Sequence, residues 1–246
     1  MSSPVYFINL RATMKENLLA KLERLLTTAG VAATVAKRDL VAVKLHFGEL
    51  GNAAFIRPIY LRKIVETVKA AGGDPFLTDA NTLYAGTRSD SPSHLTTAIQ
   101  NGFAYPVVEA PLIIADGLRG RSETAVRIDQ KNFKEAYIGT EIVAADALVS
   151  VAHFKGHELS GFGGTIKNLG MGCASRKGKL AQHSGLSPGI SGEHCIGCGE
   201  CILICPNSAI EIKWDQSIPV SHQGKGAFHQ YSFESLISRI IQIGQQ

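Results

Sequence analysis

The chain has 246 residues, of which 45% are hydrophobic and 19% are charged, and its formal net charge is +4. This composition excludes intrinsic disorder as the main state, and the length allows one large domain or a domain with an appendage. The sequence has no apolar run of the length that a membrane helix needs, no secretory signal at its start and no strongly basic region. We therefore expect a cytoplasmic protein that binds neither membranes nor nucleic acid.

The first 155 residues alternate short apolar runs with helical patterns. Strands are predicted at residues 5–10, 40–45, 75–78, 112–115 and 147–152. Helices are predicted at residues 14–29, from about residue 58 to Gly72, and at 92–101. Apolar strands separated by helices predict an α/β fold with a mostly parallel sheet that helices flank on both faces.

The remaining sequence has a different character. It is rich in glycine from Gly156 onward, and it has no acidic residue between Glu158 and Glu193. An alternating strand pattern follows at 209–214, and an amphipathic helix pattern covers 233–241. We therefore predict an α/β domain over residues 1–185, and over 186–246 a small ferredoxin-like segment with a closing helix.

Four of the five cysteines form a compact run with a recognisable spacing. They are Cys195, Cys198, Cys201 and Cys205. With the following Pro206 they match C-x2-C-x2-C-x3-C-P, which is the bacterial ferredoxin pattern for a [4Fe–4S] cluster. Structural zinc is the competing interpretation, but zinc sites normally use two C-x2-C pairs separated by a longer loop. The run therefore predicts an iron–sulfur cluster in a reducing compartment.

The sequence does not identify the fourth ligand of that cluster. In two-cluster ferredoxins the last cysteine of each run ligates the other cluster, and this chain has one run. Cys205 is the first candidate because it is nearest in sequence. The isolated Cys173 and the Cys205 of a second chain, which would make a homodimer, are the alternatives. A poorly loaded site is a further alternative, and Cys173 is equally well explained as a small buried hydrophobe.

Polar residues follow the predicted strands at the points where the strands end. They are Lys44, His46, Glu49, Asp79, Asn81, Asp116, His153, Lys155 and His157. In open α/β sheets ligands bind beyond the carboxyl ends of the strands, so we interpret the set as one pocket for an anion or a metal. Any one of these residues alone would be explained as a solvated loop residue.

A glycine-rich stretch over residues 161–168 adds Lys167 and Asn168 to the pocket candidates. It does not have the Walker A spacing. Together with Arg176, Lys177 and Lys179, Lys167 favours an anionic small molecule or the acidic patch of a redox partner protein. A solvated basic loop explains these four residues equally well. We interpret the isolated His94 and His183 as structural.

Several of these segments resemble the uncharacterised iron–sulfur centre proteins that carry the domain of unknown function numbered 362. The segments that carry the resemblance are residues 44–49, 78–84, 153–157, 164–172, 174–179 and 182–183. Members of that family usually have two ferredoxin runs in tandem. The resemblance therefore implies a shortened ferredoxin module here, and it supplies no established reaction.

These observations lead to one functional expectation with two alternatives. The expected function is electron transfer through a [4Fe–4S] cluster to or from a small ligand in the pocket. The first alternative is a non-redox enzyme in which an iron with an open coordination site acts as a Lewis acid. The second is a structural or sensor module that the cluster holds together.

Overall fold

The computed structural model describes residues 3–157, 161–184, 196–204, 210–211 and 221–222. The strands are β1 (Leu40–Lys44), β2 (Asp74–Asp79), β3 (Leu112–Ile114), β4 (Glu123–Arg127), β5 (Glu135–Gly139), β6 (Ala147–Ser150), β7 (Lys155–His157), β8 (Gly161–Gly163), β9 (Ile210–Glu211) and β10 (Ser221–His222). The helices are α1 (Leu18–Thr28), α2 (Pro58–Ala70), α3 (Ser91–Gln100), α4 (Tyr105–Val108), α5 (Thr140–Val143), α6 (Thr165–Gly170), α7 (Arg176–Ser184) and α8 (Glu200–Ile204), with a 3-10 helix η1 at Val31–Thr34.

The central sheet confirms the predicted α/β fold. Its strands lie in the order β3-β2-β1-β6, and every neighbouring pair is parallel. Lys44, the last residue of β1, pairs in register with Thr78 of β2 and Ser150 of β6. The carboxyl ends of these three strands therefore meet at one edge of the sheet.

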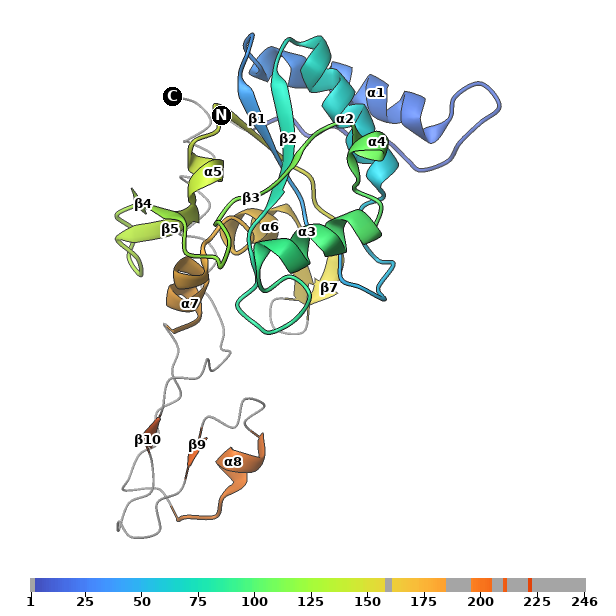
Figure 1. The fold of residues 1–246 in the computed structure, drawn as a ribbon. Coiled ribbons are helices and arrows are strands. Elements are labelled where there is room, and N and C mark those ends of the chain that lie inside the picture. Colours follow the sequence, from blue (N-terminus) through green and yellow to red (C-terminus); the bar gives the residue numbers. More distant parts are fainter. Residues whose placement is uncertain (1–2, 158–160, 185–195, 205–209, 212–220, 223–246) are drawn as a thin grey trace.

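Each face of the sheet packs on different elements. On one face, α2 buries Leu61 and Val65 against Val43 and Leu77. On the other face, the antiparallel β4–β5 hairpin, α5 and α6 build a second apolar cluster that includes Ile138 and Cys173. Figure 1 shows α1, α2 and α4 on one side of the strands, and the hairpin, α5 and α7 on the other. Both faces are thus covered, as expected for a parallel sheet.

The helix boundaries follow local chemistry. The α1 helix begins later than the periodicity predicts because the side chain of Asn17 caps it by accepting a hydrogen bond from Ala20 N. The α2 helix begins with Pro58 at its first position, and α3 begins after Asp90, whose carboxylate accepts from Ser93 N. The predicted strands at 40–45, 75–78, 112–115 and 147–152 correspond to β1, β2, β3 and β6.

The strand predicted at residues 5–10 is wrong. The structure assigns no strand there, and Val5, Phe7 and Leu10 are almost fully exposed. A strand needs a neighbour to pair its backbone groups, and the described residues provide none for this segment. Of the strand predicted at 209–214, only Ile210 and Glu211 are described, and the helix predicted at 233–241 lies outside the described residues.

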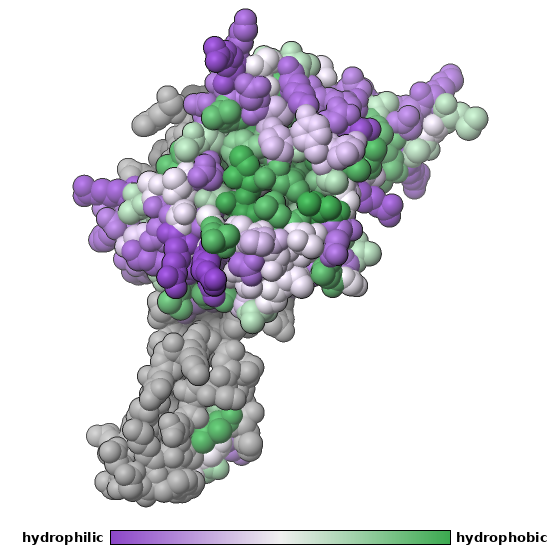
Figure 2. Space-filling model, in the orientation of Figure 1, coloured by the Kyte–Doolittle hydropathy of each residue, from purple (hydrophilic) through white to green (hydrophobic). Residues whose placement is uncertain are grey.

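The surface over β2 and β3 is apolar. In the order of the sheet β3 is an edge strand, and its Leu112 and Ile113 are only half-buried. Figure 2 shows apolar side chains gathered over β2 and β3. The polar side chains of the candidate site belong instead to the carboxyl ends of the strands.

Candidate functional site

A cavity of about 680 Å³ lies where the carboxyl ends of β1, β2 and β6 meet. Nine of the eleven pocket candidates from the sequence line it: Lys44, His46, Glu49, Asp79, His153, Lys155, His157, Lys167 and Asn168. The remaining two, Asn81 and Asp116, do not. The strand-end residues and the glycine-rich segment, which are far apart in the sequence, thus contribute to the same cavity.

Lys44 is the centre of the cavity's inner wall, a name we use for Lys44, Glu49, Asp79, Tyr84 and Arg88. Its side chain is 1% exposed, and its Nζ donates to three acceptors. These are Asp79 Oδ1 at 3.0 Å, Asn168 Oδ1 at 2.8 Å and the Leu45 carbonyl at 3.0 Å. All three N–H bonds of the ammonium are therefore satisfied inside the protein.

Asn168 connects α6 to the strand ends. Its Nδ2 donates to the Lys44 carbonyl at 3.1 Å and to Ser150 Oγ at 3.0 Å, while its Oδ1 accepts from Lys44 Nζ. A Cβ on Gly172 would lie 2.1 Å from the backbone oxygen of Asn168 and 2.6 Å from Lys44 Nζ. A glycine is therefore required at this point.

Asp79 is the buried counter-ion of the inner wall. Besides Lys44, it faces Arg88, whose Nη1 lies 3.4 Å from Oδ2, and His94, whose Nε2 lies 3.6 Å from the same oxygen. Burial alone would raise the pKa of Asp79, but the charges of Lys44 and Arg88 and the nearby His94 outweigh burial and hold it well below its usual range. Asp79 is therefore ionised across the physiological pH range.

Arg88 joins the inner wall to the loop after β1. It forms an ion pair with Glu49 and donates to Tyr84 Oη at 2.7 Å, and Tyr84 in turn donates to Glu49 Oε1 at 2.8 Å. Partial desolvation, together with the hydrogen bond to Glu49, raises the pKa of Tyr84 to about 12, so the phenol stays protonated. The pKa of Glu49 is lowered, because the bonds from Arg88 and Tyr84 outweigh its partial burial.

His46 lines the cavity as a neutral imidazole. Although His46 is open to the cavity, the surrounding protein desolvates it, and this desolvation, assisted by the charge of Arg88, lowers its pKa to about 4. Its Nδ1 accepts a hydrogen bond from Gly48 N at 2.9 Å, which leaves the proton on Nε2. His46 therefore offers a neutral donor at neutral pH rather than a cation.

Asn81 and Asp116 bond to each other instead of facing the cavity. Asn81 donates to Asp116 Oδ1 from both its backbone N and its Nδ2, each at 2.9 Å, and both side chains are buried. Burial raises the pKa of Asp116. This pair joins the end of β2 to the end of β3, so its observed contacts are structural.

The outer wall of the cavity, a name we use for Lys155, His157, Phe162 and Lys167, is more exposed. Lys155 and Phe162 are exposed on the β7–β8 hairpin, and Lys167 on α6 contacts the ring of His157. Phe162 also stacks on Phe154, with ring centroids 5.6 Å apart. The outer wall thus presents cations beside aromatic surface.

The structure adds lining residues that the sequence interpretation had not placed in the pocket. Lys179 and His183 are on α7, and Lys179 is only 7% exposed, so it does not belong to a solvated basic loop. Their i, i+4 spacing places both side chains on one helix face, and this is the sequence feature that could have predicted that they line the same cavity. Arg88 and Tyr84 also line the cavity, and nothing local in the sequence distinguishes them.

The lining carries more positive than negative charge. The cations are Lys44, Arg88, Lys155, Lys167 and Lys179, and the carboxylates are Glu49 and Asp79. Since both carboxylates are already engaged with inner-wall cations, the charge that remains available to a ligand is positive. Such a cavity favours an anion.

The cysteine run is described in part. Cys198 and Cys201 are exposed, while Cys195 and Cys205 lie outside the described residues. Gly197 and Gly199 flank Cys198 with φ of 71° and 78°, a left-handed conformation that favours glycine. The α8 helix begins directly after this turn and carries Cys201. Among the described residues, no group of three or more metal-ligating side chains is present.

Cys173 does not share this exposure. It is 1% exposed and packs in the second apolar cluster, and burial raises the pKa of its thiol to about 11. Because a metal needs the thiolate, this environment disfavours ligation. We therefore do not assign Cys173 to a metal.

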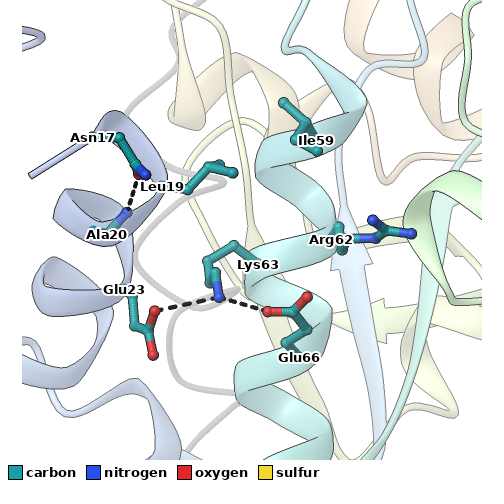
Figure 3. A pocket seen from close by; sticks show the side chains of 8 residues that line it. All are labelled: Asn17, Leu19, Ala20, Glu23, Ile59, Arg62, Lys63 and Glu66. Carbon is teal, nitrogen blue, oxygen red and sulfur yellow. Dashed lines mark hydrogen bonds and ion pairs between the residues drawn. The ribbon is translucent and has the colours of Figure 1, made fainter. Parts of the chain in front are cut away.

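A second hollow lies between α1 and α2 and has a volume of about 320 Å³ (Figure 3). Its central Lys63 forms ion pairs with Glu23 at 3.3 Å and Glu66 at 2.7 Å. Lys63, Glu23 and Glu66 are thus paired with one another, and Arg62 of the same hollow is paired with Glu109. The hollow contains none of the strand-end residues, so the larger cavity is the candidate site.

Fold and site together define an α/β protein with a cationic cavity at the carboxyl edge of a parallel sheet. The family model described as "Domain of unknown function (DUF362)" matches residues 41–242, and the chain belongs to this family. The matched range includes the strand-end residues and the whole cysteine run.

Comparisons with individual proteins give less information about this chain than the family model does. No curated protein matches the chain. Among solved structures, it is similar to the lactate racemase apoprotein from Thermoanaerobacterium thermosaccharolyticum, with 20% identity and a TM-score of 0.44. The similarity covers 71% of this chain and 36% of that one, so the chain spans about a third of the length of that protein. None of the described helices has the length and apolar character that crossing a membrane requires.

Proposed function

We propose that the protein binds a [4Fe–4S] cluster and exchanges electrons between this cluster and a small anionic ligand in the cavity. The observation that carries the proposal is the C-x2-C-x2-C-x3-C-P run, because this spacing is specific to such clusters. The excess of cations in the cavity supports the anionic ligand.

The residues present fit the cluster. Cys195, Cys198, Cys201 and Cys205 would hold it, and the two that are described expose their thiols to solvent. A Cβ added to Gly197 or Gly199 would meet nothing within 4 Å, so the turn around Cys198 leaves room beside the thiols. When bound, the cluster would supply one-electron transfer.

The two walls of the cavity have different roles in the proposal. The inner wall, in which Lys44 and Asp79 neutralise each other, fixes the shape of the cavity and excludes bulk water. On the outer wall, Lys155 is exposed and accessible to the charged group of a ligand. Phe55, Ile56 and Met171 provide apolar lining, so the ligand has an apolar part as well as a charge.

The redox part of the proposal is tested by reversible reduction. Protein purified without oxygen is reduced with dithionite, reoxidised, and followed by EPR and visible absorbance. We expect a paramagnetic signal on reduction that disappears on reoxidation. A cluster that cannot be reduced would contradict electron transfer and favour the structural module. An EPR signal of the reduced cluster that changes when pyruvate is added, while pyruvate itself is not reduced, would favour the Lewis-acid enzyme.

The ligand part is tested by thermal denaturation with small anions. Pyruvate and inorganic phosphate should raise the unfolding temperature, because a ligand that binds only the folded state stabilises it. Glycerol, which has no charge, is the control. Equal unfolding temperatures with pyruvate, phosphate and glycerol would contradict anion binding.

A further inference from the structure

The cavity contains two buried lysines whose surroundings differ. Lys44 Nζ donates to three acceptors, one of which is the carboxylate of Asp79. Lys179 Nζ donates to the carbonyl of Ala174, and no carboxylate of the described residues lies within ion-pair distance of it. The Nζ of Lys44 is thus fully occupied by its three partners, whereas Lys179 has capacity for another interaction in the cavity.

The burial of Lys179 favours its neutral form. Burial lowers the pKa of this lysine to about 8, although the charges of Asp116 and Asp79 act in the opposite direction. The charge of Lys44 lowers it further, whereas Cys173 acts in the opposite direction. At pH 8, therefore, about half of the Lys179 side chains carry an unprotonated amine with an available lone pair.

The backbone holds this amine at the cavity wall. Gly178 packs directly on β5, since a Cβ at this position would lie 2.3 Å from the carbonyl oxygen of Tyr137. The helix can therefore approach the hairpin closely, and the next residue, Lys179, lines the cavity together with Arg88 and Lys155. An amine and cations that can bind an anion thus line one cavity.

We propose that Lys179 is a nucleophile that forms an imine with a small carbonyl compound that also carries a carboxylate. The inference rests on the proposed anion binding and specifies the class of ligand. The amine lone pair forms a C–N bond to the carbonyl carbon, and loss of one water from this adduct gives the imine. The protonated imine nitrogen then carries the positive charge that the ammonium form of Lys179 would have carried, so the charge of the cavity is kept.

The experiment traps this imine. Full-length protein is incubated with pyruvate at pH 8 and treated with sodium cyanoborohydride, and the adduct is located by mass spectrometry of the intact chain and its peptides. An ordinary lysine has a pKa of about 10.4, so Lys179 should be labelled at least about tenfold more than the exposed Lys177. The labelling rate should rise with pH through about 8. Acetone, a carbonyl compound without a carboxylate, should give little labelling.

Two variants on α7 form the matched pair. Lys179→Arg should lose the adduct, and Lys177→Arg, which changes an exposed lysine of the same helix, should retain it. Circular dichroism establishes that both variants fold. The peptide map of the unchanged protein does not depend on either variant, so the proposal remains testable if Lys179→Arg fails to fold.

Propionate separates this inference from the proposed function, because it has the carboxylate of pyruvate without the carbonyl. If pyruvate and propionate both raise the unfolding temperature but Lys179 is not labelled, the imine is contradicted and anion binding stands. Labelling that is equal at Lys177 and Lys179 also overturns the imine. If neither compound stabilises the protein and no adduct forms, both proposals fail.

Discussion

The two walls of the cavity differ in how their charges are held. On the inner wall, Lys44, Asp79 and Arg88 are almost fully buried, and each has a partner of opposite charge. On the outer wall, Lys155 and Phe162 are exposed. The charges of the inner wall are therefore held by contacts within the folded chain, whereas the outer wall is available to a ligand. Substitutions on the inner wall should therefore change stability, and substitutions on the outer wall should change binding.

The largest expected effect is at the centre of the inner wall. Asp79→Asn removes the carboxylate and leaves Lys44 and Arg88 buried without their counter-ion, which should lower the free energy of unfolding by about 3–5 kcal/mol. Urea denaturation measures this loss. The control is Asp129→Asn, which breaks an exposed ion pair with Arg127 and should cost less than about 1 kcal/mol. Equal losses would contradict the difference between buried and exposed charges.

The same carboxylate predicts how stability depends on pH. Because the pKa of Asp79 is depressed in the folded state, its contribution is complete above its unfolded value of about 3.9 and is lost as the pH falls toward the folded value. The stability difference between the unchanged protein and Asp79→Asn should therefore shrink in acid. Denaturation curves between pH 7 and pH 3 measure it, and a constant difference would show that the ionised form is not stabilised.

A smaller loss is expected where α7 meets β5. Gly178→Ala places a Cβ 2.3 Å from a backbone oxygen of Tyr137, so the helix must shift, which should cost about 1–3 kcal/mol. Gly156→Ala is the matched control, because nothing lies within 4 Å of its added Cβ. Thermal denaturation compares the two variants. Equal stability of Gly178→Ala and Gly156→Ala would contradict the close packing of α7 on β5.

The outer wall should give the smallest change in stability. Lys155→Gln removes an exposed cation, so the unfolding temperature of the ligand-free protein should stay the same while the affinity for pyruvate falls by about two- to fivefold, as expected for an exposed ionic contact. Calorimetric titration measures the affinity. Lys37→Gln, which changes a lysine outside the cavity lining, should leave both quantities unchanged. An unchanged affinity in Lys155→Gln would contradict the proposed role of the outer wall.

The sequence predicts the part of the fold that depends on local patterns. The strands β1 and β2 are recognisable because their apolar runs are buried on both faces, and α1 because its apolar residues have helical spacing. The sequence pattern does not predict β4, because this strand is only partly buried and has no continuous apolar run. The opposite error at residues 5–10 arose because an apolar run becomes a strand only where a neighbour pairs with it.

The site was predictable to a similar degree. The rule that ligands bind beyond the carboxyl ends of parallel strands predicted the correct edge of the sheet for Lys44 and Asp79, because the rule depends only on strand direction. It could not show that Asn81 and Asp116 turn toward each other, because side-chain direction is set by tertiary contacts. The burial of Lys179 likewise depends on packing between segments that are far apart in the sequence.

The most direct test of the proposed function is the iron and acid-labile sulfide content of protein purified without oxygen. We expect about four iron and four sulfide per chain, and a loss of both in Cys198→Ser. Cys173→Ser should retain them, because Cys173 is buried in the apolar cluster. Stoichiometric zinc without sulfide, or full iron and sulfide content in Cys198→Ser, would contradict the proposal that this cysteine run binds a [4Fe–4S] cluster.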